Sequence, residues 1–348
     1  MRTLATAMAL LVATAASAQE SSRFLSRSPK VLPPLWRAVH LLDYDTDADL
    51  DALGERVPAL AALGVNVLVL EVDYNFAFAR HPELRRGASP VTAEAARRFA
   101  AVCRKNGVRL VPEFQSLGHQ SWKQETFPLL TVHPDFDLTP GAFAGNEGIY
   151  CREWDLTNPA VTRLVLELVD EIVDAFDADA VHVGMDEVFL LASDRSPSTK
   201  GQDPAALFAK AVNDLHAHLV GERGLTMLMW SDRLFDGAGL DFGEWESSRN
   251  GTAGALDRIP KDVVLCPWHY ERKPAYPSIP RFLARGFRVL PASWKDVDAA
   301  RALVDFAAAQ DDPRMLGHLV TTWGVQKEDL LSFPGLVEAL ARLRGKSR

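Results

Sequence analysis

Two acidic residues, Asp186 and Glu187, stand side by side directly after a short apolar run of the sequence. Further carboxylates follow two other apolar runs, at Glu71 and Asp73 and at Glu113. Carboxyl groups that a fold brings together can divide the work of catalysis, because one can donate a proton while another stabilises positive charge. Such a set suits cleavage of a glycosidic bond, whose transition state resembles an oxocarbenium ion.

A tryptophan lies at or just after the end of most of the remaining apolar runs of the chain. The four residues are Trp230, Trp268, Trp294 and Trp323. Indole rings pack against the flat C–H faces of sugars, and the indole N–H offers a polar handle. One tryptophan alone is as readily a core residue, but four at corresponding positions, beside a set of acids, predict a carbohydrate site.

The order of apolar runs and helical segments predicts the scaffold. We expect strands over residues 36–42, 65–72, 108–113, 180–184, 226–230, 263–268, 287–291 and 317–323. Helices are expected over 46–63 and 92–106, from 158, from 203 to near 221, and over 279–285, 296–309 and 335–344. This alternation predicts an α/β fold of parallel strands, a single-domain (β/α)8 TIM barrel over residues 36–348. A doubly wound open sheet is the alternative, although no G-x-G-x-x-G follows the first strand.

A barrel of this kind carries its active site at the carboxyl ends of its strands, where the acids and tryptophans fall. Neighbouring strand residues point to opposite faces, so Asp186 and Glu187 can meet one substrate only if the backbone turns there. The pair could instead cap a helix, but the next expected helix begins only at Asp203. A calcium or magnesium loop of the D-x-[DN]-x-[DN]-G type is missing, and we expect no metal and no cofactor.

Charge and the first residues of the chain predict its surroundings. The formal net charge of the 348 residues is −8, which argues against nucleic acid or an anionic membrane as partner. Residues 1–18 combine Arg2, an apolar stretch and a small-x-small end, the pattern of a secretory signal peptide. We expect an exported protein, periplasmic or extracellular, with residues 19–35 as a lead-in and no membrane span after signal removal.

The chain has three widely spaced cysteines, Cys103, Cys151 and Cys266. So sparse a set predicts buried thiols or one disulfide.

Three segments carry a resemblance to a known family. His182-Val-Gly-Met-Asp-Glu187 resembles the H-x-G-x-D-E signature of glycoside hydrolase family 20, and Val111-Pro-Glu-Phe-Gln-Ser-Leu-Gly-His119 is similar to the P-E…G-H segment after its third strand. The residues of both segments, and the opening Arg37-Ala-Val-His-Leu41, are most similar to the hexosaminidase D-like branch. The resemblance runs from about residue 36 to about residue 325.

This resemblance implies an exo-acting β-N-acetylhexosaminidase that releases terminal β-linked GlcNAc or GalNAc from glycans or oligosaccharides. It implies retention by substrate-assisted catalysis, in which the 2-acetamido oxygen of the substrate attacks the anomeric carbon. Asp186 would orient the acetamido group and Glu187 would act as general acid and base. His119, paired with Asp73 or Glu71, would orient the acids. The other implied substrate-binding residues are Arg37, Trp230, Trp268, Tyr270, Trp294 and Trp323. Glu113 would support the site residues without contacting the sugar.

The sequence departs from the family pattern at two places. The Trp-x-Glu of the eighth strand reads Trp323-Gly324-Val325 here, which leaves Glu328 as one candidate for the missing sugar contact. The tyrosine expected near the seventh strand is absent from residues 293–296, and Tyr270 is the candidate substitute. Two alternatives stay open at this point. One is a two-carboxylate retaining glycosidase that uses Glu113 and Glu187, and the other is a catalytically silent sugar-binding barrel.

Overall fold

The computed structural model describes residues 35–344, and these contain a nine-stranded parallel sheet in the order β10-β11-β1-β2-β3-β6-β7-β8-β9. The strands are β1 (Trp36–Leu41), β2 (Val67–Glu71), β3 (Arg109–Ser116), β6 (Ala180–Gly184), β7 (Thr226–Trp230), β8 (Val264–Cys266), β9 (Arg288–Val289), β10 (Ala292–Ser293) and β11 (Gly317–Thr321). The first and last strands of the chain pair in parallel, with Trp36 opposite Gly317. Residues far apart in the sequence therefore share one sheet.

The sheet closes on itself through the segment that contains β9 and β10. β9 pairs with β8 and β10 pairs with β11, so this one segment joins both neighbours. Where the segment passes from one neighbour to the other, the N–H of Ala292 donates to the carbonyl of Pro267 at 2.8 Å, and Leu319 N–H donates to the carbonyl of Pro291 at 2.9 Å. The two strands together are the seventh strand of a barrel. The predicted (β/α)8 barrel is thus confirmed, and the open sheet is excluded.

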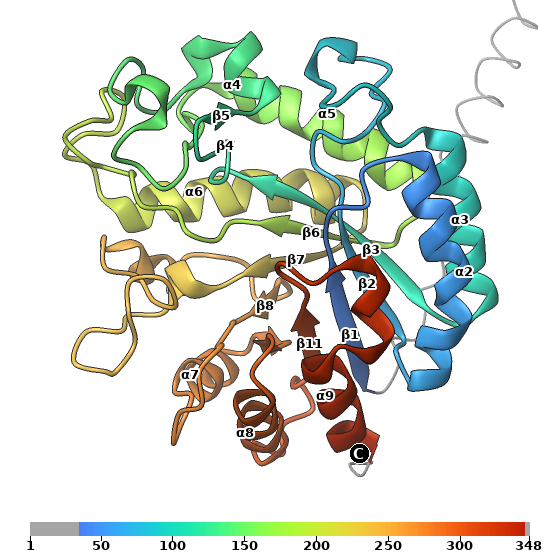
Figure 1. The fold of residues 1–348 in the computed structure, drawn as a ribbon. Helices are drawn as coiled ribbons and strands as arrows, with labels where there is room; N and C mark the ends of the chain where they lie inside the picture. Colours follow the sequence, from blue (N-terminus) through green and yellow to red (C-terminus); the bar gives the residue numbers. More distant parts are fainter. Residues whose placement is uncertain (1–34, 345–348) are drawn as a thin grey trace, which may run out of the picture. The chain divides into compact units, whose positions relative to one another are not determined.

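Helices surround the barrel, and local sequence signals set their ends (Figure 1). They are α2 (Asp47–Leu63), α3 (Ala93–Lys105), α5 (Pro159–Ala175), α6 (Pro204–His216), α7 (Ser278–Ala284), α8 (Val297–Ala308) and α9 (Pro334–Arg344). Thr46 and Asp49 form a capping box at the start of α2, and Gly64 ends it with φ 103°. Side chains also cap the starts of α3, α5, α6 and α8: Thr92, Asn158, Asp203 and Asp296.

Three parts of the fold add to the sequence expectations or differ from them. β3 continues three residues past the expected end at Glu113 and reaches Ser116. The connection from β7 to β8, where the sequence has only a weak helical pattern, contains the 3₁₀ turns η5 (Asp232–Leu234) and η6 (Thr252–Asp257). The long connection from β3 to α5 carries a small hairpin, β4 (Ser121–Trp122) and β5 (Glu125–Thr126), and the short helix α4 (Pro128–Val132).

The two faces of the strands carry different side chains. On β1, Val39 and Leu41 belong to the large hydrophobic cluster formed with the helices, whereas His40 lies inside the barrel. Alternation of side chains along a strand produces this division. Polar groups inside a barrel need partners, and His40 finds one in Glu113.

Some expectations fall at or beyond the limits of the described residues. The proposed signal peptide, residues 1–18, and nearly all of the lead-in, residues 19–35, lie outside them. Within residues 35–344, no helix combines the length and apolarity that crossing a bilayer requires. The three cysteines are all buried and free in the structure, which favours the expectation of buried thiols over that of a disulfide.

Candidate active site

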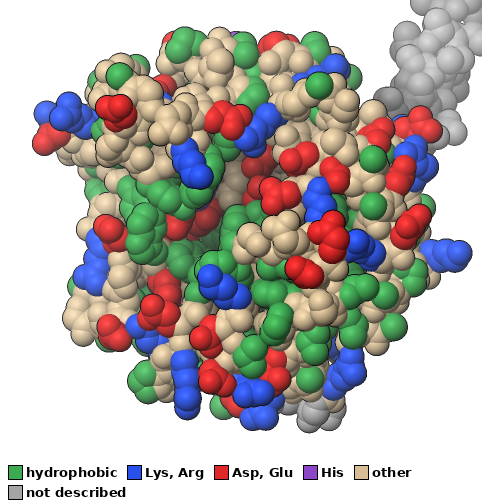
Figure 2. Space-filling model, viewed as in Figure 1, with side chains coloured by type: hydrophobic (Ala, Val, Ile, Leu, Met, Phe, Trp, Pro, Cys, Tyr) green, Lys and Arg blue, Asp and Glu red, His purple; other side chains and the backbone are tan. Residues whose placement is uncertain are grey.

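A cavity of about 540 Å³ opens at the carboxyl ends of the barrel strands. This volume lies in the range of small-molecule sites, roughly 300–1,000 Å³. Figure 2 shows acidic and hydrophobic side chains meeting in a hollow near the centre of this face. The predicted site residues that line the cavity are Glu71, Asp73, His119, Asp186, Glu187, Trp230, Trp268, Tyr270, Trp294 and Trp323.

The backbone turns at the end of β6, as a shared role of Asp186 and Glu187 requires. Left-handed φ angles occur at Gly184 (64°), Met185 (75°) and Glu187 (52°). Both acidic side chains therefore face the cavity. His119 joins them, because its Nε2 lies 3.2 Å from Asp186 Oδ2 and 3.2 Å from Glu187 Oε2.

Gly184 is required at this turn for space as well as for conformation. A Cβ at this position would lie 1.8 Å from Gln115 Oε1. Gln115 is in the extended part of β3, and its N–H donates to Asp73 Oδ1 at 2.7 Å. Close contact between the ends of β3 and β6 thus brings the His119 loop and the acidic pair together.

Burial and charge act in opposite directions on His119. Burial alone would lower its pKa, but Asp186 and Glu187 raise that pKa well above the ordinary value of histidine. The two acidic side chains thus favour binding of a proton to the ring. On the other side of the cavity, burial raises the pKa of Asp73 to about 7, although the Gln115 N–H opposes this rise. Burial and the neighbouring Asp73 also raise the pKa of Glu71.

Glu113 lies beneath the cavity and does not line it. His40 Nε2 lies 2.6 Å from Glu113 Oε2, His182 Nδ1 lies 3.0 Å from Glu113 Oε1, and Trp230 Nε1 donates to that same Oε1 at 3.0 Å. Burial would raise the pKa of Glu113, but the two histidines lower it far below its ordinary value. Both oxygens of this carboxylate are therefore engaged inside the barrel.

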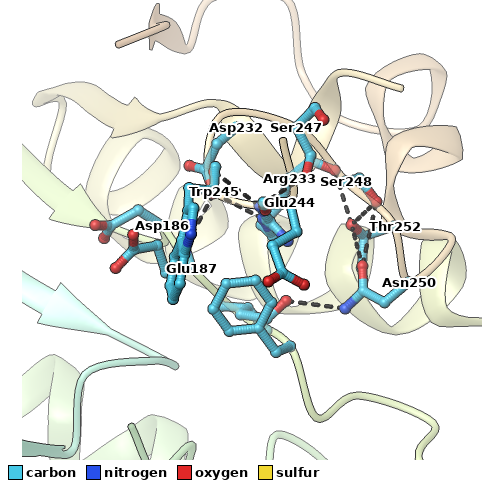
Figure 3. Close-up of polar contacts among 12 residues, drawn as sticks. Asp186, Glu187, Asp232, Arg233, Glu244, Trp245, Ser247, Ser248, Asn250 and Thr252 are labelled. Carbon is cyan, nitrogen blue, oxygen red and sulfur yellow. Dashed lines mark hydrogen bonds and ion pairs between the residues drawn. The ribbon is translucent and has the colours of Figure 1, made fainter. Parts of the chain in front are cut away.

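The segment that carries Glu187 is anchored from several sides. Asp232 Oδ2 accepts the backbone N–H of Glu187 at 3.0 Å, as Figure 3 shows. Glu153 Oε1 accepts the N–H groups of Phe189 at 2.6 Å and Leu190 at 2.7 Å. These bonds fix the backbone at Glu187 and just after it, which limits the freedom of the Glu187 carboxyl group.

The anchor at Glu153 predicts a pH dependence of stability. Burial raises the pKa of Glu153 to about 7, above its value in an unfolded chain. The folded state then binds more protons than the unfolded state, and this contribution to the free energy of unfolding is lost as the pH rises toward 7. Glu153→Gln should reduce the drop in unfolding free energy between pH 5 and pH 8 by on the order of 1–3 kcal/mol. Urea unfolding of wild type and variant at both pH values measures this difference in unfolding free energy.

The matched control is Glu147→Gln, because Glu147 is exposed in the same loop. Glutamine at position 153 can still accept the two backbone N–H groups through its amide oxygen, so the folded structure should be kept. If the unfolding free energy of the Glu153→Gln variant falls between pH 5 and pH 8 by as much as that of wild type, the raised pKa of Glu153 is not the cause of the fall.

Aromatic side chains form the wall of the cavity next to β8 and β11. Tyr270 Oη accepts the Nε1–H of Trp323 at 2.8 Å and the hydroxyl of Thr321 at 3.3 Å. Trp294 Nε1 donates to the carbonyl of Trp323 at 2.9 Å. The rings of Trp268 and Tyr270 lie 5.0 Å apart. Hydrogen bonds thus lock the ring orientations of a wall that suits a sugar face.

Comparison with known proteins gives the family of the chain. The model of the glycosyl hydrolase family 20 catalytic domain matches residues 62–329. The chain belongs to glycoside hydrolase family 20. A β-hexosaminidase of Emericella nidulans is 24% identical over 264 residues, which cover 69% of this chain and 40% of that protein. The family 20 chain thus spans less than half the length of this curated relative.

Solved structures share the fold of this family 20 chain. The chitobiase of Flavobacterium johnsoniae is similar with a TM-score of 0.61 and 19% identity, over 88% of this chain and 48% of that one. The exo β-N-acetylglucosaminidase of Vibrio harveyi, solved in complex with N-acetylglucosamine, has a TM-score of 0.61 and 16% identity, over 88% and 53%. At these identities the likeness establishes the fold.

Arg37 is not part of the cavity of this family 20 chain, contrary to the expectation from the resemblance. It lies at the amino end of β1, opposite His318, whereas the cavity is at the carboxyl ends. Its guanidinium donates to the carbonyl of Gly64. Arg37 shares the outward face of β1 with Val39, so its side chain cannot reach a sugar from inside the barrel.

Several further residues line the cavity and were not expected there, most of them from the segments that follow the barrel strands. They are Leu42, Asp43, Arg86, Gln115, Ser121, Trp122, Phe127, Tyr150 and Gly324. Tyr150 is the most central, since its ring lies 5.8 Å from that of His119. The one sequence signal was the length of the connection after β3, because loops beyond about 12–15 residues are commonly functional.

Two groups of side chains in the described residues bring possible metal ligands within 4.8 Å of one another. One is His119, Asp186 and Glu187, and the other is His40, Glu71 and Glu113. In both groups the histidine is already within hydrogen-bonding distance of a carboxylate. The same contacts can hold and pass a proton, which is the chemistry that the acidic pair needs.

Proposed function

We propose that the protein is an exo-β-N-acetylhexosaminidase that releases terminal β-linked GlcNAc or GalNAc with retention by substrate-assisted catalysis. One observation carries the proposal: two consecutive acidic side chains face one aromatic cavity and share one histidine, whose Nε2 lies 3.2 Å from an oxygen of each. Membership of family 20 supports it. The substrate supplies its own nucleophile, the 2-acetamido oxygen, so the protein needs an acid and an orienting group.

Glu187 is the proposed acid and base. It protonates the leaving oxygen, and it then takes a proton from the water that opens the oxazolinium intermediate. Asp186 is the proposed orienting group. Its Oδ1 is buried without a hydrogen-bond partner, which supports a role as acceptor of the acetamido N–H. His119 keeps both carboxylates in place and tempers the repulsion between them.

Tyr270 is proposed to donate to the acetamido oxygen. Its hydroxyl oxygen already accepts from Trp323 and Thr321, which leaves its own proton to donate into the cavity. Burial raises the pKa of this phenol above its ordinary value, so the proton stays on the oxygen. This donor would stabilise negative charge on the oxygen and align it for attack.

The far side of the cavity is proposed to bind the sugar hydroxyls. Glu328 is exposed and does not line the cavity, so the missing Trp-x-Glu contact needs another source. Asp43, Glu71, Asp73 and Arg86 line this side. Carboxylates and a guanidinium can accept from and donate to hydroxyl groups. These residues support recognition of a neutral terminal sugar without Arg37.

The two-carboxylate alternative loses support from the position of Glu113. A nucleophile must reach the anomeric carbon, but Glu113 is buried below the cavity and engaged by His40, His182 and Trp230. The silent barrel loses support because the acid, the orienting carboxylate and their histidine partner are all present. The leader pattern of residues 1–18 supports a proposed site of action outside the cytoplasm.

The test is an assay with aryl β-GlcNAc and β-GalNAc beside an aryl β-glucoside. Substrate assistance requires turnover of the first two substrates, and inhibition by a thiazoline analogue of the oxazoline intermediate. It also requires that the glucoside, which lacks the acetamido group, is not turned over. Equal turnover of the glucoside would refute the mechanism, and turnover of none of the three would refute the activity.

A further inference from the structure

Tyr150 lies beside the proposed acid, on the long connection between β3 and α5. Its side chain lines the cavity together with Glu187. Its ring lies 5.8 Å from the ring of His119, and His119 Nε2 is 3.2 Å from Glu187 Oε2. The phenol of Tyr150 also forms a hydrogen bond with the Glu187 carboxyl group. Glu187 thus faces a second donor besides His119.

The Tyr150 hydroxyl keeps its proton at neutral pH. Burial raises the pKa of this phenol, and the Glu187 carboxyl group raises it further, through its charge and through the hydrogen bond. A neutral phenol can donate a proton to a hydrogen bond, whereas a carboxylate can only accept. The bond therefore runs from Tyr150 to Glu187, and it is stronger when Glu187 is ionised, because the acceptor is then charged.

Aromatic neighbours hold the ring of Tyr150 in place. The ring lies 5.5 Å from Trp122, 4.8 Å from Trp245 and 6.2 Å from Phe189. The planes meet at 85°, 66° and 78°, the edge-to-face arrangement that aromatic pairs favour. Packing against three rings limits the positions that are open to the hydroxyl group of Tyr150.

The residue after Tyr150 ties this part of the chain to both catalytic segments. Cys151 Sγ accepts the N–H of His119 at 3.4 Å, and its S–H donates to the carbonyl oxygen of Glu187 at 3.9 Å. His119 and Glu187 both have left-handed backbones, with φ angles of 54° and 52°. Such backbones persist only where the surroundings fix them. Tyr150 is therefore joined, through its neighbour, to the two residues that its side chain approaches.

A buried arginine fixes the opposite side of the Tyr150 ring. Arg233 is fully buried and donates to the carbonyl of Trp245 at 2.9 Å. Its Nε donates to Asp232 Oδ2 at 2.6 Å, the oxygen that accepts the N–H of Glu187. Figure 3 shows this chain of contacts from Glu187 through Asp232 and Arg233 to Trp245. The ring that packs on Tyr150 and the backbone of the acid thus share one anchor.

We propose that Tyr150 is a positioning residue for hydrolysis, whose hydroxyl donates to Glu187 and stabilises the carboxylate that remains after Glu187 has protonated the leaving oxygen. The inference rests on the proposed function, because it needs Glu187 as the acid. In the first step the proton passes from Glu187 to the leaving oxygen. In the second step water returns a proton to Glu187, and Tyr150 keeps its own proton throughout. A donor to the charged form makes proton loss from Glu187 easier.

Other ionisable groups act on the same carboxyl group, from several elements of the fold. They are His119, Cys151, Glu153, Asp186, Asp232, Arg233 and Tyr270. Tyr150→Phe leaves all of them in place, keeps the aromatic ring and removes one hydroxyl group. A change in the pH profile of this variant is therefore due to that hydroxyl group.

Tyr150→Phe should lower kcat/KM for an alkyl β-GlcNAc by roughly three- to tenfold, because Glu187 becomes a weaker acid. The basic limb of the pH profile of kcat/KM should move to higher pH by about one unit, since loss of the donor makes the ionised form of Glu187 less favourable. A nitrophenyl β-GlcNAc, whose leaving group needs no protonation, should lose much less. Profiles of both substrates for variant and wild type measure these effects.

The matched control is Tyr276→Phe. Tyr276 is also buried, but its hydroxyl donates to the carbonyl of Glu271 at 3.2 Å and it does not line the cavity. This variant should keep the pH profile of wild type. Thermal unfolding of both variants shows whether each is folded.

The outcomes separate the inference from the function on which it rests. A basic limb that stays in place in Tyr150→Phe, while wild type cleaves both substrates, would overturn the inference and leave the proposed function intact. An equal loss on the two substrates without a shift of the limb would mean that Tyr150 is only structural, which also overturns it. Cleavage of neither substrate by wild type would overturn both.

Discussion

Replacing Glu187 by glutamine is expected to lower kcat on a β-N-acetylhexosaminide with a poor leaving group by roughly 10²- to 10⁴-fold, the usual contribution of a positioned acid. Glutamine has the shape of glutamate but cannot give a proton to the leaving oxygen. An aryl substrate whose leaving group needs no protonation should lose much less in its first step. Steady-state rates on an alkyl and a nitrophenyl hexosaminide measure the difference.

The Glu187→Gln variant should remain folded, because Asp232 accepts the backbone N–H of residue 187 and not its side chain. Equal thermal unfolding of variant and wild type checks this point. The two substrates are the internal control, since misfolding would lower both rates alike. Full activity on the alkyl substrate would remove Glu187 from the role of acid.

Asp186→Asn is the second large effect that we expect, a loss of roughly 10²–10³ in kcat, as when one preorganised electrostatic contact is removed. The buried Oδ1 of Asp186 has no partner among the described residues, and its negative charge would stabilise positive charge on the acetamido nitrogen as the oxygen attacks. Asparagine has no such charge. The variant should also bind the thiazoline inhibitor more weakly, which inhibition constants measure.

A matched control for this substitution is Asp194→Asn, because the Asp194 side chain is 88% exposed and its ion pair with Lys200 lies at the surface. This variant should keep wild-type values of kcat and inhibition. Loss of kcat in Asp186→Asn with unchanged thiazoline affinity would mean that Asp186 does not contact the acetamido group.

The scaffold was predictable because its signals are local. Ala180–Gly184 and Thr226–Trp230 are strands with the expected bounds. Capping residues begin the helices α2, α3, α5, α6 and α8, and Gly64 ends α2, all of which can be read from a few neighbouring residues. Parallel strands then bring their carboxyl ends together, so acids and tryptophans distant in the sequence could be expected in one cavity.

The rest depended on tertiary contacts, which leave little trace in the sequence. Arg37 was expected near the sugar from its place in a motif, but strand alternation sends its side chain outward. Tyr150 and Trp245 sit in loops without periodicity, and their positions depend on contacts such as the three carbonyl groups that Arg233 reaches. No local sequence pattern predicts that an arginine just after β7 donates to carbonyl groups of a loop 11 to 14 residues further along the chain.

The bonds of Arg233 bear on any attempt to replace the loop that contains Glu244, Trp245 and Ser247, whose carbonyl groups accept from its side chain. Its side chain joins the loop backbone to Asp232, and Asp232 joins the backbone of Glu187. A transplanted loop without carbonyl groups at matching positions would leave the buried guanidinium of Arg233 without acceptors. Its contact with Asp232 would then change, and with it the position of Glu187. Exchange of this loop with that of another protein should therefore include Asp232 and Arg233 as part of the graft.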